Sequence, residues 1–560
     1  MQKIWKVKQQ DASLQKKLSA ALNISPVLAR LLINRGLILS EEAKSFLNPA
    51  LSSLHSFNLL PDISKAKQRI HKALANKEKV LLFSDYDADG LTSLAVLKIA
   101  LDRLGVNSQA YIPHRLKEGY GLGHAAVKYA LDNVFSLVIT LDCGISNFQE
   151  VEDLKRHNID VIIIDHHHLH SGKLPCADAV INPKREDSDY PFKDLAGVGL
   201  SYKFASCLLE DELEEELDLV CLGTVADVAP LLGENRIIVK EGLKKLNNTR
   251  RPGLKALLEK AGIANKTLNA GHISYILGPR LNACGRIDSA DAALELLLCQ
   301  SRERSVELAE HLHNKNRERQ RIEGGILDEA LSRLEYDIDL NKERVIVLYQ
   351  ENWHQGVLGI VAAKIADRFH RPAIVVSFND QGLGKGSGRS IESFHLFEGL
   401  LECQEHLEGF GGHKKACGLS ILKHNIEGFK QSINQIAQRL SAQDLLPSLH
   451  IDLALELADL NETLLSDLEA LEPFGQDNPR PVFSSNNLRI KSKPALLAKD
   501  TLKFWVTDGK STYSAVGFGM GSYLDLVSSA KEINLAYKIS RDTWNGNNQL
   551  QLEIEDIRLS

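Results

Sequence analysis

Residues 79–90 read KVLLFSDYDADG, and this stretch decides the fold. A short, largely apolar run over 79–83 is followed at once by Asp85, Asp87 and Asp89. An apolar run without polar alternation is typical of a strand buried on both faces of a parallel sheet. Carboxylates at alternate positions repel one another, and a divalent cation relieves that repulsion. The sequence therefore predicts a buried strand that ends at a metal site.

A calcium-binding EF-hand loop also begins with alternating aspartates and a glycine, so it is the first alternative to consider. That loop needs a bidentate Glu at its twelfth position, and the residue at that position here is Val96. An EF-hand loop also follows a helix, whereas this cluster follows an apolar strand. We therefore reject the EF-hand interpretation of this segment.

Two further apolar runs end in potential metal ligands. The run LVITL at 137–141 is followed by Asp142, and the run VIII at 161–164 is followed by DHHH at 165–168. In an open parallel sheet, ligands bind beyond the carboxyl ends of the strands. We therefore expect these acidic and histidine side chains to meet at one edge of a parallel sheet.

Asp227 is a candidate for a fourth contribution to this site. It lies in GTVADVAP (223–230), and an Asp in an apolar stretch is costly unless it is paired or binds a metal. A helix cap or an ion pair with an arginine therefore remains an open alternative. Oxygen ligands with one or two imidazoles suit Mn²⁺ or Mg²⁺ better than zinc. Bridging carboxylates are the arrangement used for two-metal phosphoryl chemistry.

The composition excludes several classes of protein. With 44% hydrophobic and 25% charged residues, the 560-residue chain is globular and long enough for several domains. No apolar run reaches the roughly 18–20 residues of a membrane helix, and the first residues lack a secretory-signal pattern. The eight cysteines form no CxxC pair, so we expect a reducing cytoplasm and no cysteine-rich zinc site. The net charge of −6 requires that a polyanion bind through local basic groups or metal ions.

The character of the sequence changes along the chain. Residues 289–335 are rich in charge and predict a long helix with a solvated face. Apolar strands at 345–348 and 373–376 begin a second α/β unit, and alternation around Leu552 indicates a half-buried antiparallel strand. We therefore predict five segments. They are a helical N-terminal segment (1–50), an α/β domain (51–288), a connecting long helix (289–340), a smaller α/β domain (341–445) and a β-rich domain (446–560).

These motifs resemble those of the DHH phosphoesterase superfamily. The matching residues are DYDADG (85–90), Asp142, DHH (165–167) and Asp227. Further stretches resemble one family within it, the bacterial exonucleases specific for single-stranded DNA, over roughly residues 50–560. Those stretches are GPRLNACGR (278–286), WHQGVLGI (353–360), GGH (411–413) with Ala416 and Gly418, PFGQDNP (473–479), and WNG (544–546) with IED (554–556). The resemblance implies an α/β multidomain fold with a parallel-sheet DHH domain, a long helix, a DHHA1 domain and a C-terminal β-barrel of the OB type.

The resemblance also implies two divalent cations, Mn²⁺ or Mg²⁺, and roles for individual residues. The implied metal ligands are Asp87, Asp89, Asp142 as the bridging group, His166 and Asp227. Many members have a ligating His where this chain has Phe83, so Asp85 is expected to replace that ligand. By the same resemblance, His167 faces the scissile phosphate and Asp165 orients a histidine. His167, Asp165 and Asp142 are therefore the expected catalytic residues.

Three further groups of residues are candidates for binding the substrate. Arg280, Asn282 and Arg286 lie in one segment with glycine and proline, where the arginines either clamp phosphates or form structural ion pairs. His354 and His413 lie beside glycines and either contact the substrate or are structural. The third group is KGSGRS (385–390), which has neither the P-loop order nor the dinucleotide glycine spacing. Its donors fit a phosphate or a terminal nucleotide, and they are Ser387, Arg389 and Ser390.

The C-terminal part combines aromatic and basic residues. Such a mixture suits the stacking of single-strand bases in an OB-fold, although most aromatic residues of a small β domain belong to its core. We expect Trp505 and Trp544 to contact DNA. The full set is Phe504, Trp505, Tyr513, Phe518 and Trp544, with Lys491, Lys493, Lys499 and Lys503.

The resemblance implies a metal-dependent 5′→3′ exonuclease that hydrolyses single-stranded DNA to 5′-mononucleotides in DNA repair and recombination. It further implies a monomer without membrane association that works with a single-strand-binding protein and a RecQ-type helicase. One rival is a phosphodiesterase for oligoribonucleotides or cyclic dinucleotides, which generally lacks a C-terminal OB-type domain. The other rival is an inactive binding module, which would lack metal-binding acids, and none of them is missing here.

Overall fold

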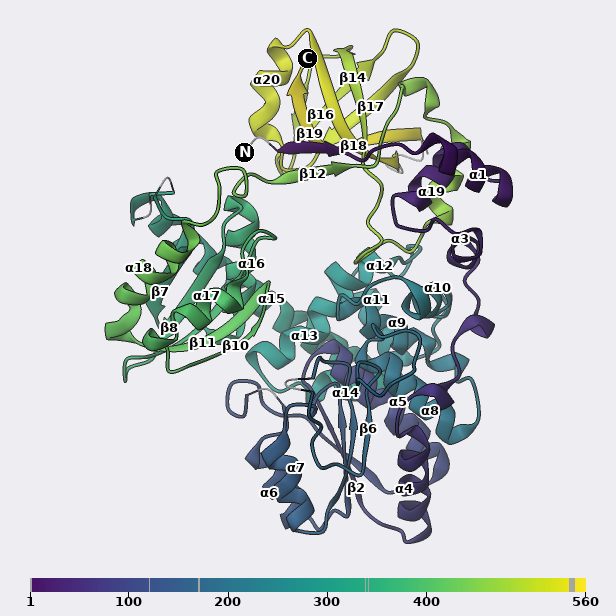
Figure 1. The fold of residues 1–560 in the computed structure, drawn as a ribbon, viewed down its shortest axis with the longest axis vertical. Coiled ribbons are helices and arrows are strands. Elements are labelled where there is room, and N and C mark those ends of the chain that lie inside the picture. Colours follow the sequence, from purple (N-terminus) through teal and green to yellow (C-terminus); the bar gives the residue numbers. More distant parts are fainter. Residues whose placement is uncertain (1–2, 120, 170–171, 338, 341, 543–548) are drawn as a thin grey trace. The chain divides into compact units, whose positions relative to one another are not determined.

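The computed structural model describes residues 3–119, 121–169, 172–337, 339–340, 342–542 and 549–560 (Figure 1). These residues form two compact units. One unit comprises Ala50–Leu445, and the other joins Met1–Pro49 to Leu446–Ser560. The beginning of the chain and its C-terminal part therefore belong to one unit, an association that the sequence did not indicate.

A five-stranded parallel sheet forms the centre of the first α/β domain. The strands, in the order β3-β2-β4-β5-β6, are β3 (Ser108–Tyr111), β2 (Val80–Ser84), β4 (Leu137–Leu141), β5 (Asp160–Ile164) and β6 (Ala179–Ile181). Every residue of β2 and β4 is buried, as expected for strands covered on both faces. The predicted parallel sheet is confirmed.

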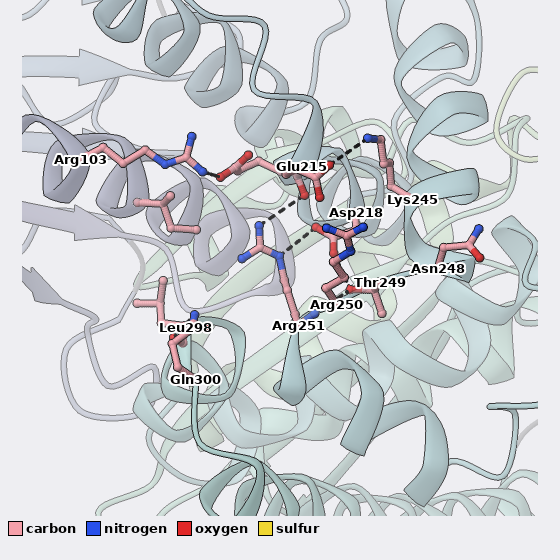
Figure 2. Close-up of a pocket in the computed structure, with 12 residues that line it drawn as sticks. Arg103, Glu215, Asp218, Lys245, Asn248, Thr249, Arg250, Arg251, Leu298 and Gln300 are labelled. Carbon is pink, nitrogen blue, oxygen red and sulfur yellow. Dashed lines mark hydrogen bonds and ion pairs between the residues drawn. The ribbon is translucent and has the colours of Figure 1, made fainter.

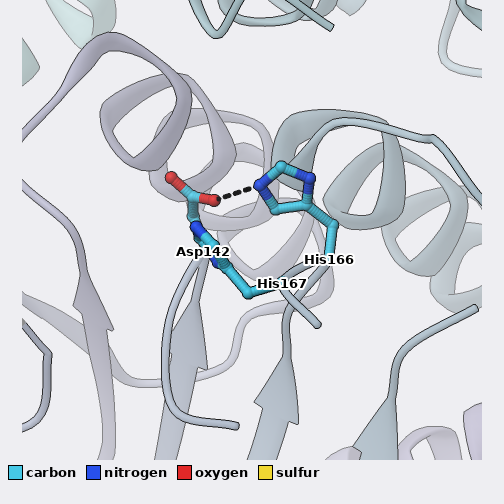
Figure 3. Close-up of side chains that lie close together, drawn as sticks. All are labelled: Asp142, His166 and His167. Atoms are coloured by element: carbon cyan, nitrogen blue, oxygen red, sulfur yellow. Dashed lines mark ion pairs between the residues drawn. The ribbon is translucent and has the colours of Figure 1, made fainter. Parts of the chain in front are cut away.

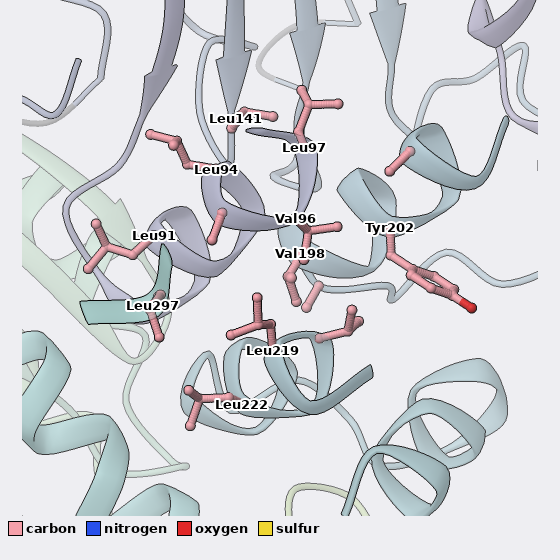
Figure 4. Packing of buried hydrophobic residues seen from close by; sticks show 14 of the residues in the cluster. Leu91, Leu94, Val96, Leu97, Leu141, Val198, Tyr202, Leu219, Leu222 and Leu297 are labelled. Atoms are coloured by element: carbon pink, nitrogen blue, oxygen red, sulfur yellow. The ribbon is translucent and has the colours of Figure 1, made fainter. Parts of the chain in front are cut away.

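Helices cover both faces of this sheet (Figure 1). One layer contains α4 (Ile63–Ala75), α5 (Ala88–Leu104), α8 (Gly197–Leu209) and α9 (Leu217–Ala226), and the other contains α6 (His124–Asp132) and α7 (Phe148–Arg156). Because side chains alternate along a strand, Leu82 packs in the first core and Leu81 in the second. The first core includes Leu94 of α5, Val198 of α8 and Leu219 of α9 (Figure 4).

A helical region follows the sheet and ends in one long helix. Its helices are α10 (Gly233–Asn247), α11 (Pro252–Lys260), α12 (Ala270–His272), α13 (Gly278–Ile287), α14 (Asp291–Leu298) and α15 (Arg302–Asp337). The long helix α15 places Leu308 in the first core and Ile326 in the core of the next domain. The prediction of a solvated charged face is wrong at Asn316 and Glu323, each 3% exposed. Glu323 is buried because Arg319 and Lys364 pair with it.

A second, mixed sheet forms the smaller α/β domain, in the order β10-β11-β9-β8-β7. Its strands are β7 (Ile346–Glu351), β8 (Ala373–Phe378), β9 (Leu383–Arg389), β10 (Gly409–His413) and β11 (Ala416–Leu422). Its helices are α16 (Leu358–Phe369), α17 (Leu396–Glu402) and α18 (Ile426–Ala437). Only β7 and β8 pair in parallel, and the other neighbours are antiparallel.

The C-terminal domain contains a ring of five strands, β14-β18-β19-β17-β16, closed by the pairing of β14 with β16. Its elements are β12 (Ser448–Ile451), β13 (Leu453–Ala454), α19 (Glu462–Ala470), β14 (Phe483–Ile490), β15 (Ala495–Leu497), β16 (Thr501–Thr507), β17 (Thr512–Gly517), α20 (Leu524–Ser529), β18 (Glu532–Asp542) and β19 (Gln549–Leu559). Leu552 and Ile554 are buried on β19, which confirms the predicted alternating strand.

The first residues of the chain complete this C-terminal unit. They form β1 (Ile4–Val7), α1 (Ala12–Leu22), α2 (Pro26–Ile33) and α3 (Ser40–Leu47). The prediction of a purely helical start missed β1, which pairs in parallel with β12. The Trp5 indole N–H donates to Asp556 Oδ2 at 2.6 Å, and the Arg558 guanidinium lies 4.4 Å from the centre of the Trp5 ring. The N-terminal segment is thus held on the sheet of the C-terminal domain.

Candidate metal centre and substrate-binding residues

The carboxyl ends of three neighbouring strands bring the candidate metal ligands together. Asp85 directly follows β2, Asp142 directly follows β4, and Asp165 directly follows β5. Asp87 begins helix α5, where its Oδ1 accepts hydrogen bonds from the backbone N–H groups of the next turn. Asp227 ends helix α9. One sheet edge and two helix ends therefore fix the positions of these side chains.

The possible ligand atoms form three overlapping groups, and within each group they lie within 4.8 Å of one another. The groups are Asp142, His166 and His167 (Figure 3), then Asp89, His166 and Asp227, and finally Asp85, Asp87 and Asp142. Asp142 and His166 each belong to two groups. If two cations bind to these groups, Asp142 would be the carboxylate available to both of them.

The backbone adopts the left-handed conformation at two positions beside these ligands. Asp142 has a φ of 60°, and Val228, which follows Asp227, also has a φ of 60°. Such a conformation costs roughly 1–2 kcal/mol for a residue other than glycine, and a β-branched residue such as Val adopts it rarely. Backbone strain of this kind is concentrated at functional sites, and here it lies beside two candidate ligands.

The atoms of His166 and Asp142 that face each other lack hydrogen-bond partners. His166 Nε2 lies 3.1 Å from Asp142 Oδ1, 3.9 Å from Asp89 Oδ2 and 4.0 Å from Asp227 Oδ2. Both His166 Nε2 and Asp142 Oδ1 are buried, and neither makes a hydrogen bond within the described residues. Unpaired buried polar atoms are costly, and a cation bound between them would satisfy both. The residues present therefore fit a divalent metal.

Burial and mutual repulsion shift the pKa values of these groups. Burial, and then the charge of nearby carboxylates, raises the pKa of Asp85 to about 8, of Asp89 to about 7 and of Asp227 to about 9. The same causes raise the pKa of Asp142 well above its ordinary value. Burial lowers the pKa of His166 to about 3, so its imidazole stays neutral and keeps a lone pair. His166 therefore adds no positive charge to the carboxylates that it faces.

Helix α8 holds the carboxylate of Asp89. The Gly197 N–H donates to Asp89 Oδ2 and the Val198 N–H donates to Asp89 Oδ1, each at 2.7 Å. A Cβ atom at Gly197 would lie 2.8 Å from Asp142 Oδ1, so only glycine allows the helix to approach this closely. Each oxygen of Asp89 retains a lone pair for a metal.

Both carboxylate oxygens of Asp165 form hydrogen bonds with neighbouring residues. Its Oδ1 accepts from the His167 backbone N–H at 3.0 Å and lies 2.7 Å from His167 Nδ1, and its Oδ2 accepts from the Ile145 N–H at 2.9 Å. Although burial opposes it, the hydrogen bond from His167 lowers the pKa of Asp165 to about 2. Although burial again opposes it, Asp165 raises the pKa of His167 to about 9. His167 is therefore a partly exposed imidazolium held by a buried carboxylate.

The alternatives left open for Asp227 can now be compared with its surroundings. The residue does end a helix, as one alternative required. Its carboxylate forms no ion pair with an arginine in the described parts of the chain, and it faces His166 instead. Asp85 also keeps capacity for a cation, because only its Oδ1 is engaged, by the Tyr86 N–H at 2.8 Å.

The residues of segment 278–286 have different surroundings. Asn282 Oδ1 accepts from the Ala88 N–H at 2.7 Å, so this side chain fixes the loop that carries the aspartates. Arg280 donates to the Ile276 carbonyl at 2.6 Å, within its own helical segment. Arg286 donates to the Gly356 carbonyl at 3.3 Å, and burial lowers its pKa to about 10. Neither arginine forms an ion pair with an acid among the residues described, so the structural ion pairs that the sequence left open are not found there.

The smaller α/β domain holds Ser387 and Arg389 against helix α16. Arg389 Nη1 donates to Ser387 Oγ at 3.2 Å, and a Cβ atom at Gly359 would lie 2.9 Å from that oxygen. Ser390 instead donates to the Phe394 carbonyl at 2.9 Å. Ser387 and Arg389 therefore lie close to the first turn of α16, where backbone N–H groups add to the attraction for an anion.

The two histidines beside glycines also differ. His354 Nδ1 accepts from the Gly356 N–H at 3.2 Å, which fixes its ring at the start of a helical turn. Burial, and then the charges of Arg389 and His167, lowers the pKa of His413. His413 is therefore within electrostatic reach of both the Arg389 site and the metal centre.

A cleft of about 720 Å³ is lined by both α/β domains, and it contains residues that the sequence did not indicate. Arg115 lies 4.9 Å from the centre of the Tyr86 ring, and Lys385 and Ser387 line the same cleft. Arg115 could have been found from the sequence as a basic residue in the glycine-containing loop after β3. Asn182, at the carboxyl end of β6, was also missed because β6 is short, and its amide donates to the His167 carbonyl at 3.0 Å.

The aromatic residues of the C-terminal domain separate into core and surface. Phe504 is 1% exposed and belongs to the core, whereas Trp505 is 39% exposed and Phe518 is 64% exposed. The alternation along β16 explains the difference between Phe504 and Trp505, whose side chains point to opposite faces. Trp544 lies outside the described residues.

Comparisons with known proteins agree with this architecture. Residues 79–224 match the DHH family, N-terminal domain, residues 342–439 match the DHHA1 domain, and residues 451–556 match the RecJ OB domain. The chain is 36% identical over 560 residues to the single-stranded-DNA-specific exonuclease RecJ of Bacillus subtilis, covering 99% of this chain and 71% of that protein. It is 34% identical to the RecJ of Escherichia coli, covering 95% of this chain and 96% of that one.

The chain belongs to the RecJ family. The crystal structure of Thermus thermophilus RecJ in complex with Mn²⁺ superposes with a TM-score of 0.86 at 28% identity, covering 100% of this chain and 80% of that one. A structure of exonuclease RecJ bound to manganese gives a TM-score of 0.60 at 32% identity, covering 73% of this chain and 98% of that one. RecJ membership therefore rests on both sequence and fold. Within the residues described, helices of the length and apolarity needed to cross a bilayer are absent.

Proposed function

We propose that this chain is a metal-dependent exonuclease that hydrolyses single-stranded DNA from its 5′ end to 5′-mononucleotides, in DNA repair and recombination. The observation that carries the proposal is the buried pair of Asp142 Oδ1 and His166 Nε2, which lack hydrogen bonds and belong to overlapping ligand groups. RecJ relatives named as single-stranded-DNA-specific exonucleases, and RecJ structures with Mn²⁺ or Mg²⁺, support it.

Two divalent cations, Mn²⁺ or Mg²⁺, would be held by residues at the sheet edge. These ligands are Asp85, Asp87, Asp89, Asp142, His166 and Asp227. When bound, the cations activate water and neutralise negative charge that develops on the phosphate. The hydrogen bonds from α8 to Asp89 and the backbone conformation at Asp142 keep these carboxylates in position for the ions.

His167 would contact the scissile phosphate, and Asp165 would act through His167. Asp165 holds His167 by two contacts, which fixes the ring and keeps it protonated at neutral pH. A protonated imidazole donates to a non-bridging phosphate oxygen and so stabilises the charge of the transition state. Asp165 would therefore be a positioning residue, and Asp142 would serve by holding the cations.

The cationic and polar residues around the cleft would bind the DNA backbone. Arg286 and Arg389, both without carboxylate partners among the residues described, suit phosphates, and Ser387, His354 and His413 add neutral donors. Arg280, Asn282 and Ser390 were also proposed as substrate-binding residues. Each of them also makes a hydrogen bond, to Ile276, Ala88 and Phe394 respectively, that fixes its position in the site.

The surface of the C-terminal domain would hold the strand by stacking. We expect Trp505→Ala to weaken binding of long single strands by ~1–3 kcal/mol, because an exposed indole stacks on bases. The turnover number at saturating DNA should stay unchanged, since the metal ligands lie in the other unit. Fluorescence anisotropy with a labelled strand measures the affinity. The matched comparison is Phe518→Ala, which removes another exposed aromatic side chain from the same domain. Trp544 is the second proposed stacking residue.

The finer biological assignments rest on the family resemblance alone. They are a cytoplasmic location, a monomeric state, and cooperation with a single-strand-binding protein and a RecQ-type helicase. Light scattering of the purified protein tests the monomer, and pull-down with each purified partner tests the two interactions.

The proposed activity is tested with single strands that carry a label at one end or the other. With Mn²⁺, a 5′-labelled strand should release labelled mononucleotide at once, whereas a 3′-labelled strand should shorten stepwise before its label is released. EDTA should stop both reactions. Cleavage of dinucleotides without cleavage of long strands would instead favour a phosphodiesterase, and absence of cleavage with both metals would favour a binding module.

A further inference from the structure

A pocket of about 280 Å³ lies at the far end of helix α5 from the metal centre (Figure 2). Its walls come from the end of α5, the start of α9, the loop between α10 and α11, and the residues between α14 and α15. Arg103 in the pocket and Asp89 at the metal centre belong to the same helix. At 1.5 Å per residue they are separated by roughly 21 Å along its axis. The pocket is therefore distinct from the metal centre.

Most charges that line this pocket are balanced by one another (Figure 2). The ion pairs are Arg251 Nε with Asp218 Oδ1 at 2.9 Å, Lys245 Nζ with Glu215 Oε1 at 3.2 Å, and Arg103 with Glu216. The Thr249 hydroxyl also donates to Asp218 Oδ2 at 2.6 Å. These pairs account for each carboxylate of the lining and for all but one of its basic residues.

One oxygen of the Glu216 carboxylate and the Arg250 guanidinium remain without a partner among the described residues. Glu216 is 1% exposed, and its Oε2 is buried without a hydrogen bond inside the described chain. Arg250 is exposed, and no acid among the described residues forms an ion pair with it. An unpaired oxygen of a buried carboxylate is costly, and a hydrogen-bond donor removes that cost. The pocket is thus complementary to a molecule that carries a donor group and an anionic group.

The size and the apolar walls narrow the class of ligand. The volume is near the small end of the roughly 300–1,000 Å³ of ligand sites, which suits one nucleotide better than a dinucleotide. Ile99 and Leu298 contribute apolar surface that suits a flat ring. A carboxylate accepts from the amino group of a base, and a guanidinium binds phosphate.

We propose that this pocket binds a nucleoside monophosphate whose base carries an exocyclic amino group. The amino group donates to Glu216 Oε2, and the phosphate contacts Arg250. Adenine, guanine and cytosine carry such a group, whereas thymine does not. This inference rests on the proposed function for the origin of the ligand, because a DNA exonuclease that releases mononucleotides produces these compounds.

Calorimetric titration of the full chain in EDTA with dAMP and with dTMP tests the proposal. We expect dAMP to bind at least about tenfold more tightly than dTMP, because a hydrogen bond to a charged group contributes ~1.5–3 kcal/mol. Arg250→Ala should weaken dAMP binding by at least about tenfold. The matched control is Lys255→Ala, an exposed cation that does not line the pocket, and it should bind dAMP like the unsubstituted chain.

Arg389→Ala distinguishes nucleotide binding in this pocket from binding in the cleft that is lined by both α/β domains. This variant should retain the dAMP binding that Arg250→Ala loses. Equal affinity for dAMP in Arg250→Ala and the unsubstituted chain would overturn the inference, as would equal affinity for dTMP and dAMP. Binding of amino acids in place of nucleotides would overturn it as well. Exonuclease activity is measured apart from these titrations, so a failed nuclease assay and a failed binding experiment remain distinguishable.

Discussion

Two clusters of charged side chains in the Ala50–Leu445 unit differ in how their charges are balanced. At the sheet edge, Asp89, Asp142 and Asp227 face one another, and burial together with neighbouring carboxylates raises their pKa values. In the pocket at the far end of α5, Asp218 lies against Arg251 at 2.9 Å. Both clusters contain buried acids. The difference teaches that a binding site for cations is recognised by the absence of internal partners, since acidic residues alone occur in both places.

The largest expected effect breaks the unbalanced cluster. Asp142→Asn should lower the hydrolysis rate with Mn²⁺ by more than about 1,000-fold, because the shared carboxylate holds the charge that activates water. Asn retains the shape of Asp and tolerates the left-handed backbone at this position, so the fold should be preserved. Initial rates on labelled single strands give the effect.

Metal-dependent stability serves as the control for this substitution. At 100 times its dissociation constant, a bound ion should add about 2.7 kcal/mol to the free energy of unfolding of the unsubstituted chain. The increment should be much smaller in Asp142→Asn. Without metal, the variant should be as stable as the unsubstituted chain or more stable, because one repelling carboxylate is gone. Substantial turnover with both ions bound would disprove the shared role of Asp142.

The next effect breaks the balanced cluster. Asp218→Ala leaves the largely buried Arg251 and the Thr249 hydroxyl without their partner, so it should lower the free energy of unfolding by about 3 kcal/mol. The hydrolysis rate per folded molecule should change little, since the pocket is separate from the metal centre. Urea unfolding and rates normalised to folded protein give the two values. Asp218→Asn, which retains the hydrogen-bonding shape, should be less destabilising. A stable but inactive Asp218→Ala would show that the two clusters are not independent.

The smallest effect concerns an exposed pair of the same cluster. Lys245→Ala should change the free energy of unfolding by less than about 1 kcal/mol, because Lys245 is 33% exposed and Glu215 is 66% exposed. In 1 M salt, where the Debye length is about 3 Å, the remaining difference should disappear. Urea titrations at low and high salt measure it. A loss comparable to that of Asp218→Ala would mean that exposure does not set the strength of these pairs.

Much of the fold could be predicted because short-range patterns carry it. The apolar runs that end at Leu141 and Ile164 are buried on both faces, and this burial requires a parallel sheet. The position of acids directly after the strands then places them at one edge. Phe504 and Trp505 are adjacent in the sequence, yet only the pleat of the strand decides which of them is exposed.

Other features could not be predicted because they depend on partners that are distant in the sequence. The charged helix α15 gave no sign that Glu323 is buried, since its burial depends on Lys364 of another helix. The role of Asn282 was equally hidden, because its partner Ala88 is 194 residues away. Asn182 was missed for another reason, because β6 is short. Sequence periodicity reports which face of an element is apolar, but it does not report which polar groups meet.

The pairing of β1 with β12 has a consequence for how the protein is made. Ile4 pairs with Ser448, so the first strand leaves the ribosome long before its partner is synthesised. At ~5–20 residues per second, the delay is about 20 to 90 seconds. During that time residues 50–445 are synthesised and begin to fold, while residues 4–7 remain an unpaired edge, open to proteases and chaperones. We therefore expect pulse-labelled nascent chains to gain protease resistance in two stages, with the N-terminal segment protected last.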